Sequence, residues 1–149
     1  MTEDEKWMKI AINEAKIAND KEEIPVGALI IKGHKIIAKS HNQSILKHDA
    51  TAHAEIQAIR KAGEFMQNHR LIDTTLYVTL EPCSMCLGAI IHARIKRVVF
   101  GAYETKIGVN STCIDCQKKL INDNQIIIKG GILESDCKNL LQSFFKLRR

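Results

Sequence analysis

The stretch TTLYVTLEPCSMCLGAIIHA, residues 74–93, decides the fold because it reads as a strand that runs directly into a helix. Alternating and β-branched residues predict a strand over residues 74–80. The apolar segment CSMCLGAIIHA, residues 83–93, predicts a helix, and Pro82 stands where a helix commonly begins. A strand followed at once by a helix is typical of α/β proteins.

Further strand and helix patterns flank this unit on both sides. Upstream, the helical spacing of apolar residues predicts a first helix from about residue 3 to residue 19. Two apolar runs, VGALIIK and KIIAKS, are separated by Lys32-Gly33-His34 and predict a hairpin whose start is marked by Pro25. The other predicted elements are a helix over residues 52–63 with Gly63 as its C-cap, strands over residues 97–102 and 125–129, and a closing helix over residues 133–149 with apolar positions Leu133, Cys137, Leu140, Leu141, Phe144 and Phe145.

The order of these elements predicts the fold class. A hairpin followed by strands that alternate with helices is typical of a mixed α/β sheet with helices on both faces. The sequence has 149 residues, of which 45% are hydrophobic, so it can form one well-buried core but is too short for two ordinary domains. We therefore expect a single domain over residues 1–149. The least regular segment, residues 103–124, has a length typical of functional or disordered loops.

Charge and composition limit the partners and the compartment. The formal net charge of +5 favours contact with an anionic partner, although a charge this small also fits an ordinary protein surface. The first ten residues are acidic and lack the apolar segment of a signal peptide, and no apolar run is long enough to span a bilayer. We therefore expect a cytoplasmic protein that has no membrane contact. Since thiols stay reduced there, an odd number of five cysteines favours metal binding or redox activity over a disulfide framework.

Cys83 and Cys86 are the first candidates for metal ligands. They stand one helical turn apart at the start of a predicted helix, so their sulfurs face the same way and the helix N-terminus favours the thiolate form. A catalytic zinc ion usually takes three protein ligands and keeps a fourth position for water. The third ligand is predicted upstream at His53, where another helix opens. Two thiolates and an imidazole would leave Zn²⁺ acidic enough to lower the pKa of a bound water.

Glu55, two residues after His53, is predicted to move protons and not to bind the metal. An acid beside such a water can take its proton and hand it to a substrate nitrogen. Residues two apart on a regular helix point in nearly opposite directions, so the pairing requires that both stand in the first turn at a pocket wall. Together, His53-Ala54-Glu55 and Pro82 to Cys86 match the signature H-x-E followed by P-C-x-x-C of zinc-dependent nucleobase deaminases.

Two other interpretations of the cysteines are open at this point. Cys83 and Cys86 could form a four-cysteine zinc knot with Cys113 and Cys116, but the interval between the pairs exceeds the usual spacing of about 15–20 residues. Cys113 and Cys116 are otherwise free thiols, with a redox role as a minor alternative. The second interpretation is a non-catalytic binding module, in which a fourth protein ligand would close the zinc site. Cys137 lies on the apolar stripe of the last helix and is predicted to be a core residue.

Over nearly its whole length the sequence resembles the bacterial tRNA-specific adenosine deaminases of the TadA type, members of the cytidine deaminase-like superfamily. The resemblance is carried by IPVGALI, TAHAEIQAIRKAG, the stretch from MQNHR to VVFGA, and the closing LLQSFFKLRR. It implies a three-layer α/β/α sandwich around a five-stranded mixed sheet, a homodimer, and one Zn²⁺ per subunit. The activity it implies is conversion of adenosine to inosine at the wobble position of a tRNA anticodon.

The resemblance also implies roles for individual residues. His53, Cys83 and Cys86 match the zinc ligands of the family, and Glu55 matches its proton shuttle. The implied substrate-binding residues are Asn42, which matches a nucleoside contact, Val26, Ala54 and Pro82, which fall where the base pocket is lined, and Glu104, which is expected near the RNA backbone where the family commonly has Asp.

The sequence departs from the family within KIGVNSTCIDC, residues 106–116, where Ser111 and Thr112 replace a Gly-Ser pair. Loss of that glycine alters the backbone conformations open to the loop but leaves the predicted chemistry intact. A deaminase of the same superfamily that acts on a free base, nucleoside or nucleotide would carry the same zinc motif. The terminal FFKLRR fits an RNA contact, or simply basic residues at the end of a helix.

Overall fold

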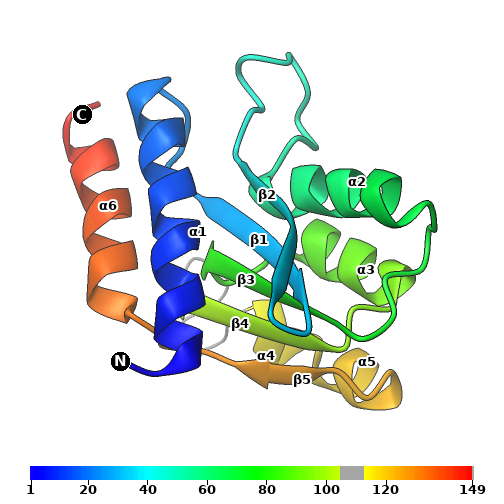
Figure 1. Cartoon of the computed structure of the whole chain (residues 1–149). Helices are drawn as coiled ribbons and strands as arrows, with labels where there is room; N and C mark the ends of the chain where they lie inside the picture. The colour runs from blue at the N-terminus through cyan, green and yellow to red at the C-terminus, as the bar shows by residue number, and fades with distance from the viewer. Residues whose placement is uncertain (105–112, 149) are drawn as a thin grey trace.

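The computed structural model describes residues 1–104 and 113–148, and its centre is a mixed sheet of five strands in the order β2-β1-β3-β4-β5 (Figure 1). β1 pairs antiparallel with β2 and β3, whereas β4 pairs parallel with β3 and β5. The predicted hairpin and the three later strands are all present. Their bounds are β1 Gly27–Lys32, β2 Lys35–His41, β3 Thr74–Leu80, β4 Arg97–Ala102 and β5 Ile127–Lys129.

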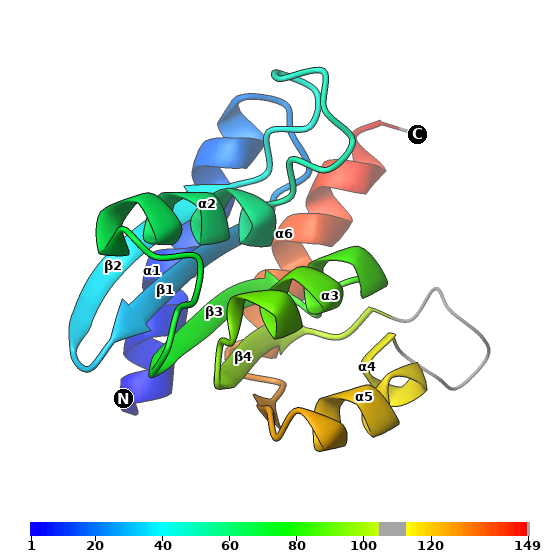
Figure 2. The ribbon, with the colours of Figure 1, turned by 90° about the vertical axis from the view of Figure 1, so that its right-hand side faces the viewer.

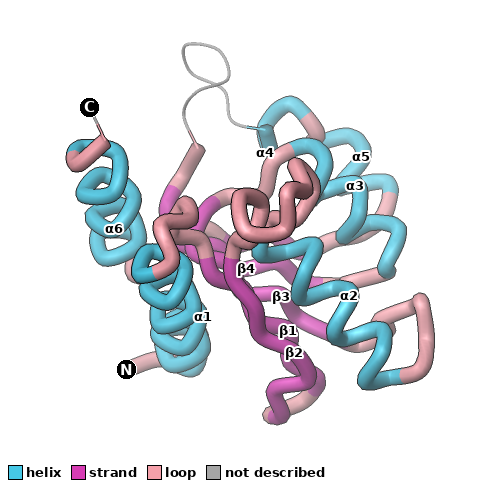
Figure 3. Tube along the Cα trace, turned by 90° about the horizontal axis from the view of Figure 1, so that it is seen from above, coloured by secondary structure: helices cyan, strands magenta, loops and turns pink. Residues whose placement is uncertain are grey.

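Helices cover both faces of the sheet, as the views in Figures 2 and 3 show. One face carries α1 and α6, and the other carries α2, α3 and the short helices α4 and α5. A separate buried apolar cluster fills the space between the sheet and each helical layer. The predicted three-layer α/β/α architecture is therefore confirmed. The helices are α1 Glu3–Asp20, α2 Ala54–Met66, α3 Ser84–Ala93, α4 Cys113–Cys116, α5 Lys118–Asp123 and α6 Glu134–Lys146.

Helix α1 is fixed at its start by local and long-range hydrogen bonds. The side chains of Thr2 and Glu5 each accept a bond from the other residue's backbone N–H, which forms a capping box. Asp4 in the first turn accepts two bonds from the Arg97 guanidinium, at 3.0 and 2.8 Å, and one from the Tyr77 hydroxyl at 2.6 Å. Because Tyr77 lies on β3 and Arg97 on β4, this carboxylate ties α1 to the middle of the sheet.

The register of the strands brings the candidate site residues together at one edge of the sheet, which is formed by the start of β1 and the ends of β2, β3 and β4. Gly27 at the start of β1 pairs with His41 at the end of β2, and Leu80 at the end of β3 pairs with Ala102 at the end of β4. Since β1 runs antiparallel to β3, its start lies at the edge where β3 and β4 end. The connections before β1 and after β2, β3 and β4 therefore meet at that edge.

The predicted C-terminus of the second helix is wrong. Gly63 is not its C-cap, because α2 continues to Met66 and Gln67 takes the left-handed conformation with φ of 53°. Met66 packs against the apolar cluster beneath α2, so burial of its side chain stabilises the additional turn.

The segment expected to be least regular, residues 103–124, contains the helices α4 and α5. Ile121 on α5 is buried in the core cluster that also holds α2 and α3, which explains why the chain is ordered there. Ser111 and Thr112, where the sequence departs from the family it resembles, lie outside the described residues.

The closing helix, α6, has the predicted apolar stripe, but near its C-terminal end one residue of the stripe is exposed. Cys137 and Phe144 are buried, as expected, and Leu140 and Leu141 are partly buried. Phe145, by contrast, is 37% exposed. Within the described ranges, none of the helices combines the length and the apolar composition that are needed to cross a bilayer.

Candidate functional site

Three predicted ligand residues lie together where α2 and α3 begin. His53 and Cys83 are the N-cap residues of these two helices, and Cys86 lies in the first turn of α3. The His53 Nδ1 atom is 3.7 Å from the Cys83 Sγ and 3.5 Å from the Cys86 Sγ, and the three ligand atoms all lie within 4.8 Å of one another. The two halves of the sequence motif therefore meet in space.

The donor set and its spacing fit a zinc ion. Two thiol sulfurs and one imidazole nitrogen are ligands that Zn²⁺ takes in proteins, with bonds of about 2.3 Å to sulfur and about 2.0–2.1 Å to nitrogen. Tetrahedral bonds of that length hold a nitrogen and a sulfur about 3.6 Å apart, close to the two observed distances. The cluster thus requires little rearrangement to hold such an ion.

The protonation of the cysteines agrees with this arrangement. A hydrogen bond from the Cys86 thiol lowers the pKa of Cys83 to about 4, although burial opposes the shift. The same bond, together with burial, raises the pKa of Cys86 well above its usual range. The bond to Cys83 also raises the pKa of His53. Two thiols that share one proton can exchange it for a cation, because metal binding displaces protons from thiol ligands.

Glu55 lies in the first turn of α2 beside this cluster, and its side chain is buried. Burial raises the pKa of its carboxyl to about 7, and its side chain is hydrogen-bonded to that of Cys86. His53 has extended backbone angles of φ −70° and ψ 157°, so helical periodicity does not set the direction of its side chain relative to Glu55. The two residues do not share the first turn, as the sequence required, but the objection from helical periodicity does not apply, because His53 is the N-cap and both side chains line the pocket.

A pocket of about 690 Å³ opens directly onto His53, Glu55 and Cys83. Its walls come from the α1–β1 connection, the ends of β2, β3 and β4, and one side of α6. The remaining lining residues are Ile24, Val26, Asn42, Leu80, Glu81, Ala102, Tyr103, Glu104, Lys138, Leu141, Gln142, Phe145 and Lys146.

The predicted substrate-binding residues divide into two groups. Val26, Asn42 and Glu104 line the pocket. Ala54 and Pro82 are buried, and neither is among the lining residues within the described ranges. Each of these two residues lies next in the chain to a residue that does line the pocket, so they can affect its shape through their neighbours.

Sequence reasoning missed two buried glutamates that hold the surrounding loops. The Glu81 carboxylate accepts hydrogen bonds from the backbone N–H groups of Glu104 and Ile114, at 2.9 and 3.1 Å. The Glu23 carboxylate accepts bonds from two consecutive backbone N–H groups in the β2–α2 loop. The adjacency of Glu81 to the P-C-x-x-C motif was a usable signal, whereas nothing near Glu23 in the sequence indicates its partners.

Sequence reasoning named the terminal FFKLRR as a candidate RNA contact but missed that the rest of α6 contributes to the pocket. Lys138, Leu141, Gln142, Phe145 and Lys146 form one wall of it. The apolar stripe predicted for this helix includes Leu141 and Phe145, but the pattern indicated packing and not a pocket.

The four-cysteine interpretation is not supported by the geometry. Cys116 is exposed, and the Cys113 Sγ accepts a hydrogen bond from the Ser84 hydroxyl at 4.0 Å. Neither residue belongs to the group of ligand atoms formed by His53, Cys83 and Cys86, as judged over residues 1–104 and 113–148. Cys137 is a buried core residue, as predicted.

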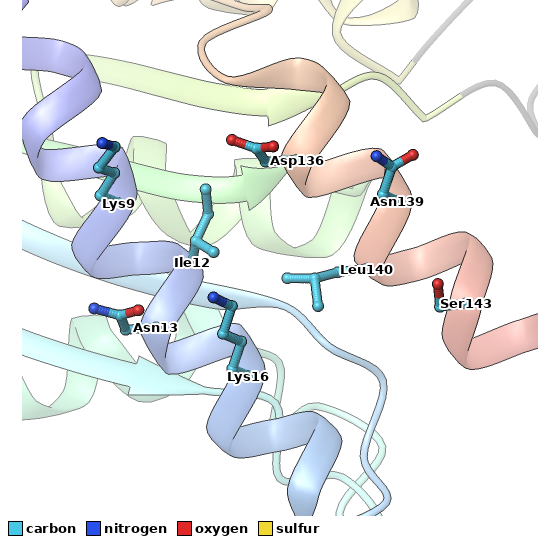
Figure 4. A pocket seen from close by; sticks show the side chains of 8 residues that line it. All are labelled: Lys9, Ile12, Asn13, Lys16, Asp136, Asn139, Leu140 and Ser143. Atoms are coloured by element: carbon cyan, nitrogen blue, oxygen red, sulfur yellow. The ribbon is translucent and has the colours of Figure 1, made fainter. Parts of the chain in front are cut away.

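A second groove lies between α1 and α6, and Figure 4 shows the side chains that line it. Lys9 and Lys16 project from α1, and Asp136 and Asn139 from α6. It includes no residue that the sequence predicts for metal or substrate binding. The predicted chemistry is therefore confined to the pocket at the other side of α6.

Comparisons with known proteins agree with this geometry. Residues 2–149 match the family model of the MafB19-like deaminases. A tRNA-specific adenosine deaminase from Buchnera aphidicola subsp. Baizongia pistaciae is 52% identical, covering 98% of this chain and 90% of the relative. A solved structure from a study of A-to-I editing by tRNA:A34 deaminases is 37% identical with a TM-score of 0.83, covering 90% of this chain and 97% of that chain.

The fold is also shared with a deaminase of a free base. The X-ray structure of a guanine deaminase from Bacillus subtilis is 38% identical with a TM-score of 0.66, covering 80% of this chain and 70% of that chain. The full-length matches are decisive for the family, because they extend well beyond the residues of the metal motif. The chain therefore belongs to the MafB19-like deaminases by its family model and to the tRNA-specific adenosine deaminases by its identity to them.

Proposed function

We propose that this protein is a hydrolase that converts adenosine to inosine at the wobble position of a tRNA anticodon. The observation that carries the proposal is the position of Glu55, a buried carboxyl beside a His-Cys-Cys cluster in an open pocket. A purely structural metal site has no use for such a carboxyl at a pocket wall. The 52% identity to a tRNA-specific adenosine deaminase supports the choice of substrate.

Within this proposal, His53, Cys83 and Cys86 hold one Zn²⁺ per subunit. The ion would supply Lewis acidity that makes a water a strong nucleophile near neutral pH. Placing both cysteines at the start of α3 gives the sulfurs a fixed direction and the positive end of the helix dipole, which stabilises their negative charge.

Glu55 moves the protons of the reaction. It takes a proton from the attacking water and places it on N1 of adenine, which makes C6 more electrophilic. The C6–O bond then forms, and Glu55 takes the second proton from the new hydroxyl on C6 and gives it to the amino group. The C6–N bond breaks, so that ammonia leaves and inosine keeps the proton on N1. Burial raises the pKa of this carboxyl above its ordinary value, which favours transfer of a proton to it from a water molecule.

The pocket residues bind and orient the nucleoside. Asn42 is placed to hydrogen-bond to it, and Val26 provides an apolar wall for the base. Ala54 and Pro82 affect the shape of the base site through the lining residues next to them in the chain. Glu104, which lines the pocket, contacts the RNA backbone. An unstacked base in an anticodon loop enters such a site at less cost than a base in a duplex.

We also propose an oligomeric state, a compartment and a partner for the protein. The protein acts as a homodimer of single-domain subunits in the cytoplasm, where tRNA is its partner. The net charge of +5 supports affinity for phosphate.

A free-base deaminase is the second candidate, because the chain is 38% identical to a guanine deaminase of similar fold. The two candidates differ in what they must bind outside the pocket. Parallel incubations of the metal-loaded protein with an anticodon stem-loop, adenosine, cytidine and guanine, followed by measurement of ammonia and inosine, separate them. The proposal expects turnover of the stem-loop alone, and ammonia from guanine without inosine in the RNA would refute it.

A further inference from the structure

The β2–α2 loop, residues 43–52, connects two residues of the candidate site. Asn42 precedes it and His53 follows it, and both line the pocket. In Figures 1 and 2 the loop extends beyond the end of the sheet, at the top of each picture. Within the loop Ile45 and Leu46 are 64% and 61% exposed, so apolar packing does little to hold these two residues in place.

The backbone of Ile45 and Leu46 is held by the carboxylate of Glu23. This residue belongs to the α1–β1 connection and is 1% exposed. Its Oε1 accepts a hydrogen bond from the Ile45 N–H at 3.1 Å, and its Oε2 accepts one from the Leu46 N–H at 2.7 Å. Bonds from N–H groups to a buried carboxylate are stronger than those between neutral groups. The two exposed side chains therefore stand on a backbone that is firmly anchored.

The same connection also supplies two residues to the pocket wall. Ile24 and Val26 follow Glu23 by one and three residues, and both line the pocket. The Val26 carbonyl accepts a hydrogen bond from the Asn42 N–H at 3.1 Å. Asn42 is thus held to this connection by its own backbone, and Glu23 of the same connection holds the loop that follows Asn42.

The base of the loop is held by other groups. The Gln43 N–H donates to the Ala52 carbonyl at 2.9 Å, and the Gln57 side-chain amide donates to the Gln43 side chain at 2.8 Å. His41 and Glu14 continue this chain of polar contacts into α1. Loss of the Glu23 bonds would therefore detach the backbone of Ile45 and Leu46 from the α1–β1 connection, while the hydrogen bonds within the loop remain and the metal ligands stay on their helices.

We propose that Glu23 is a positioning residue that sets the β2–α2 loop and Asn42 for substrate binding. It touches neither the substrate nor the metal and acts through the backbone of Ile45 and Leu46. The inference rests on the proposed function for its kinetic readout. We expect the RNA to contact this loop outside the pocket equally in the ground state and in the transition state, so displacement of the loop raises KM and leaves kcat nearly unchanged.

The test compares Glu23→Gln with a control, Glu22→Gln, in the metal-loaded full chain. Glutamine keeps the shape of the side chain but turns one acceptor oxygen into a donor that faces a backbone N–H. Glu22 is the exposed neighbour. With an anticodon stem-loop as substrate, we expect Glu23→Gln to retain its metal and to raise KM about tenfold, the effect of losing one hydrogen bond. The expected change in kcat is less than about twofold.

Kinetic constants of Glu23→Gln equal to those of Glu22→Gln would overturn the proposal, as would a fall in kcat at unchanged KM. If Glu23→Gln does not fold, Glu23→Asp replaces it, since its shorter carboxylate cannot reach both N–H groups, and the same rise in KM is expected.

Amide hydrogen exchange separates failure of this inference from failure of the proposed function. Even if the wild type forms no inosine, the Ile45 and Leu46 amides must exchange slowly in the wild type and in Glu22→Gln, and quickly once Glu23 is replaced. Rapid exchange of both amides in the wild type would refute the anchoring itself.

Discussion

Burial gives Glu55 a pKa of about 7, so its carboxyl can exchange a proton near neutral pH. Its neighbours His53, Cys83 and Cys86 have their donor atoms directed at one another. Replacing the proton-moving residue should therefore affect the chemistry alone, whereas replacing a ligand should affect metal binding as well.

Replacing Glu55 is expected to abolish chemistry without loss of metal. Glu55→Ala should lower kcat by about 10²–10⁴-fold, the usual contribution of a general acid–base group, and should keep one zinc ion per chain. Inosine formation and metal content by elemental analysis are measured together. Glu64→Ala, an exposed position on the same helix, is the control and should behave as the wild type. Retained activity in Glu55→Ala would refute the proton-transfer role.

Replacing a ligand cysteine is expected to remove both metal and activity. Cys86→Ala deletes one of the three donors, so bound zinc and inosine formation should fall together. Cys137→Ala removes a buried cysteine in α6 and should keep the metal while losing about 1 kcal/mol of stability through lost packing. Normal zinc content in Cys86→Ala would contradict the assignment.

At the scale of elements, close backbone contacts set the distance between α1 and the sheet. A Cβ added to Gly27 at the start of β1 would lie 2.0 Å from the Ala11 carbonyl oxygen of α1. Gly88 on α3 has no atom within 4 Å of an added Cβ.

These glycines predict opposite effects of the same substitution. Gly27→Ala should destabilise the fold by about 3 kcal/mol or more, because backbone cannot move aside as a side chain can. Gly88→Ala should leave stability unchanged or raise it by up to about 1 kcal/mol through helix propensity. Chemical denaturation of the two variants checks both values, and equal stabilities would show that α1 does not pack on β1 in this way.

The Asp4 carboxylate ties α1 to β3 and β4 and gives this contact a pH dependence. Hydrogen bonds from the Arg97 guanidinium hold the pKa of Asp4 well below its usual range. A depressed folded-state pKa means that the stabilisation is complete above the unfolded pKa of about 3.9 and is lost as the pH falls towards the folded value.

Asp4→Asn should therefore cost about 1–3 kcal/mol of unfolding free energy at neutral pH. The difference from the wild type should stay constant from about pH 5 to pH 8 and shrink below about pH 4. Asp123→Asn, which breaks an exposed pair with Lys119, is the control and should cost less than about 0.5 kcal/mol. Denaturant titrations across this pH range measure the unfolding free energies of both variants. A difference between Asp4→Asn and the wild type that grows below about pH 4 would contradict the predicted direction of the pH dependence.

At the scale of the whole molecule, the sequence predicts the layers and the metal cluster but not the loops that frame the pocket. Strands and helices follow from local periodicity, and His53, Cys83 and Cys86 follow from short motifs at helix starts. The end of α2 was misplaced because packing of Met66, a tertiary contact, outweighs the local signal of Gly63.

The functions of Glu23 and Glu81 could not be predicted for a related reason. Each accepts hydrogen bonds from backbone N–H groups that lie more than twenty residues away in the chain. Backbone groups carry no residue-specific signal, so only the folded arrangement identifies them as partners. The wall that α6 contributes to the pocket depends likewise on how the helix crosses the end of the sheet.

The most direct measurement is inosine sequencing of a tRNA pool treated with the zinc-loaded protein, beside pools treated with Glu55→Ala and with buffer. The account predicts inosine at the first anticodon position of adenosine-bearing tRNAs in the wild-type pool and unchanged adenosine in the other two. An unmodified pool despite one zinc ion per chain, or inosine that persists with Glu55→Ala, would contradict it.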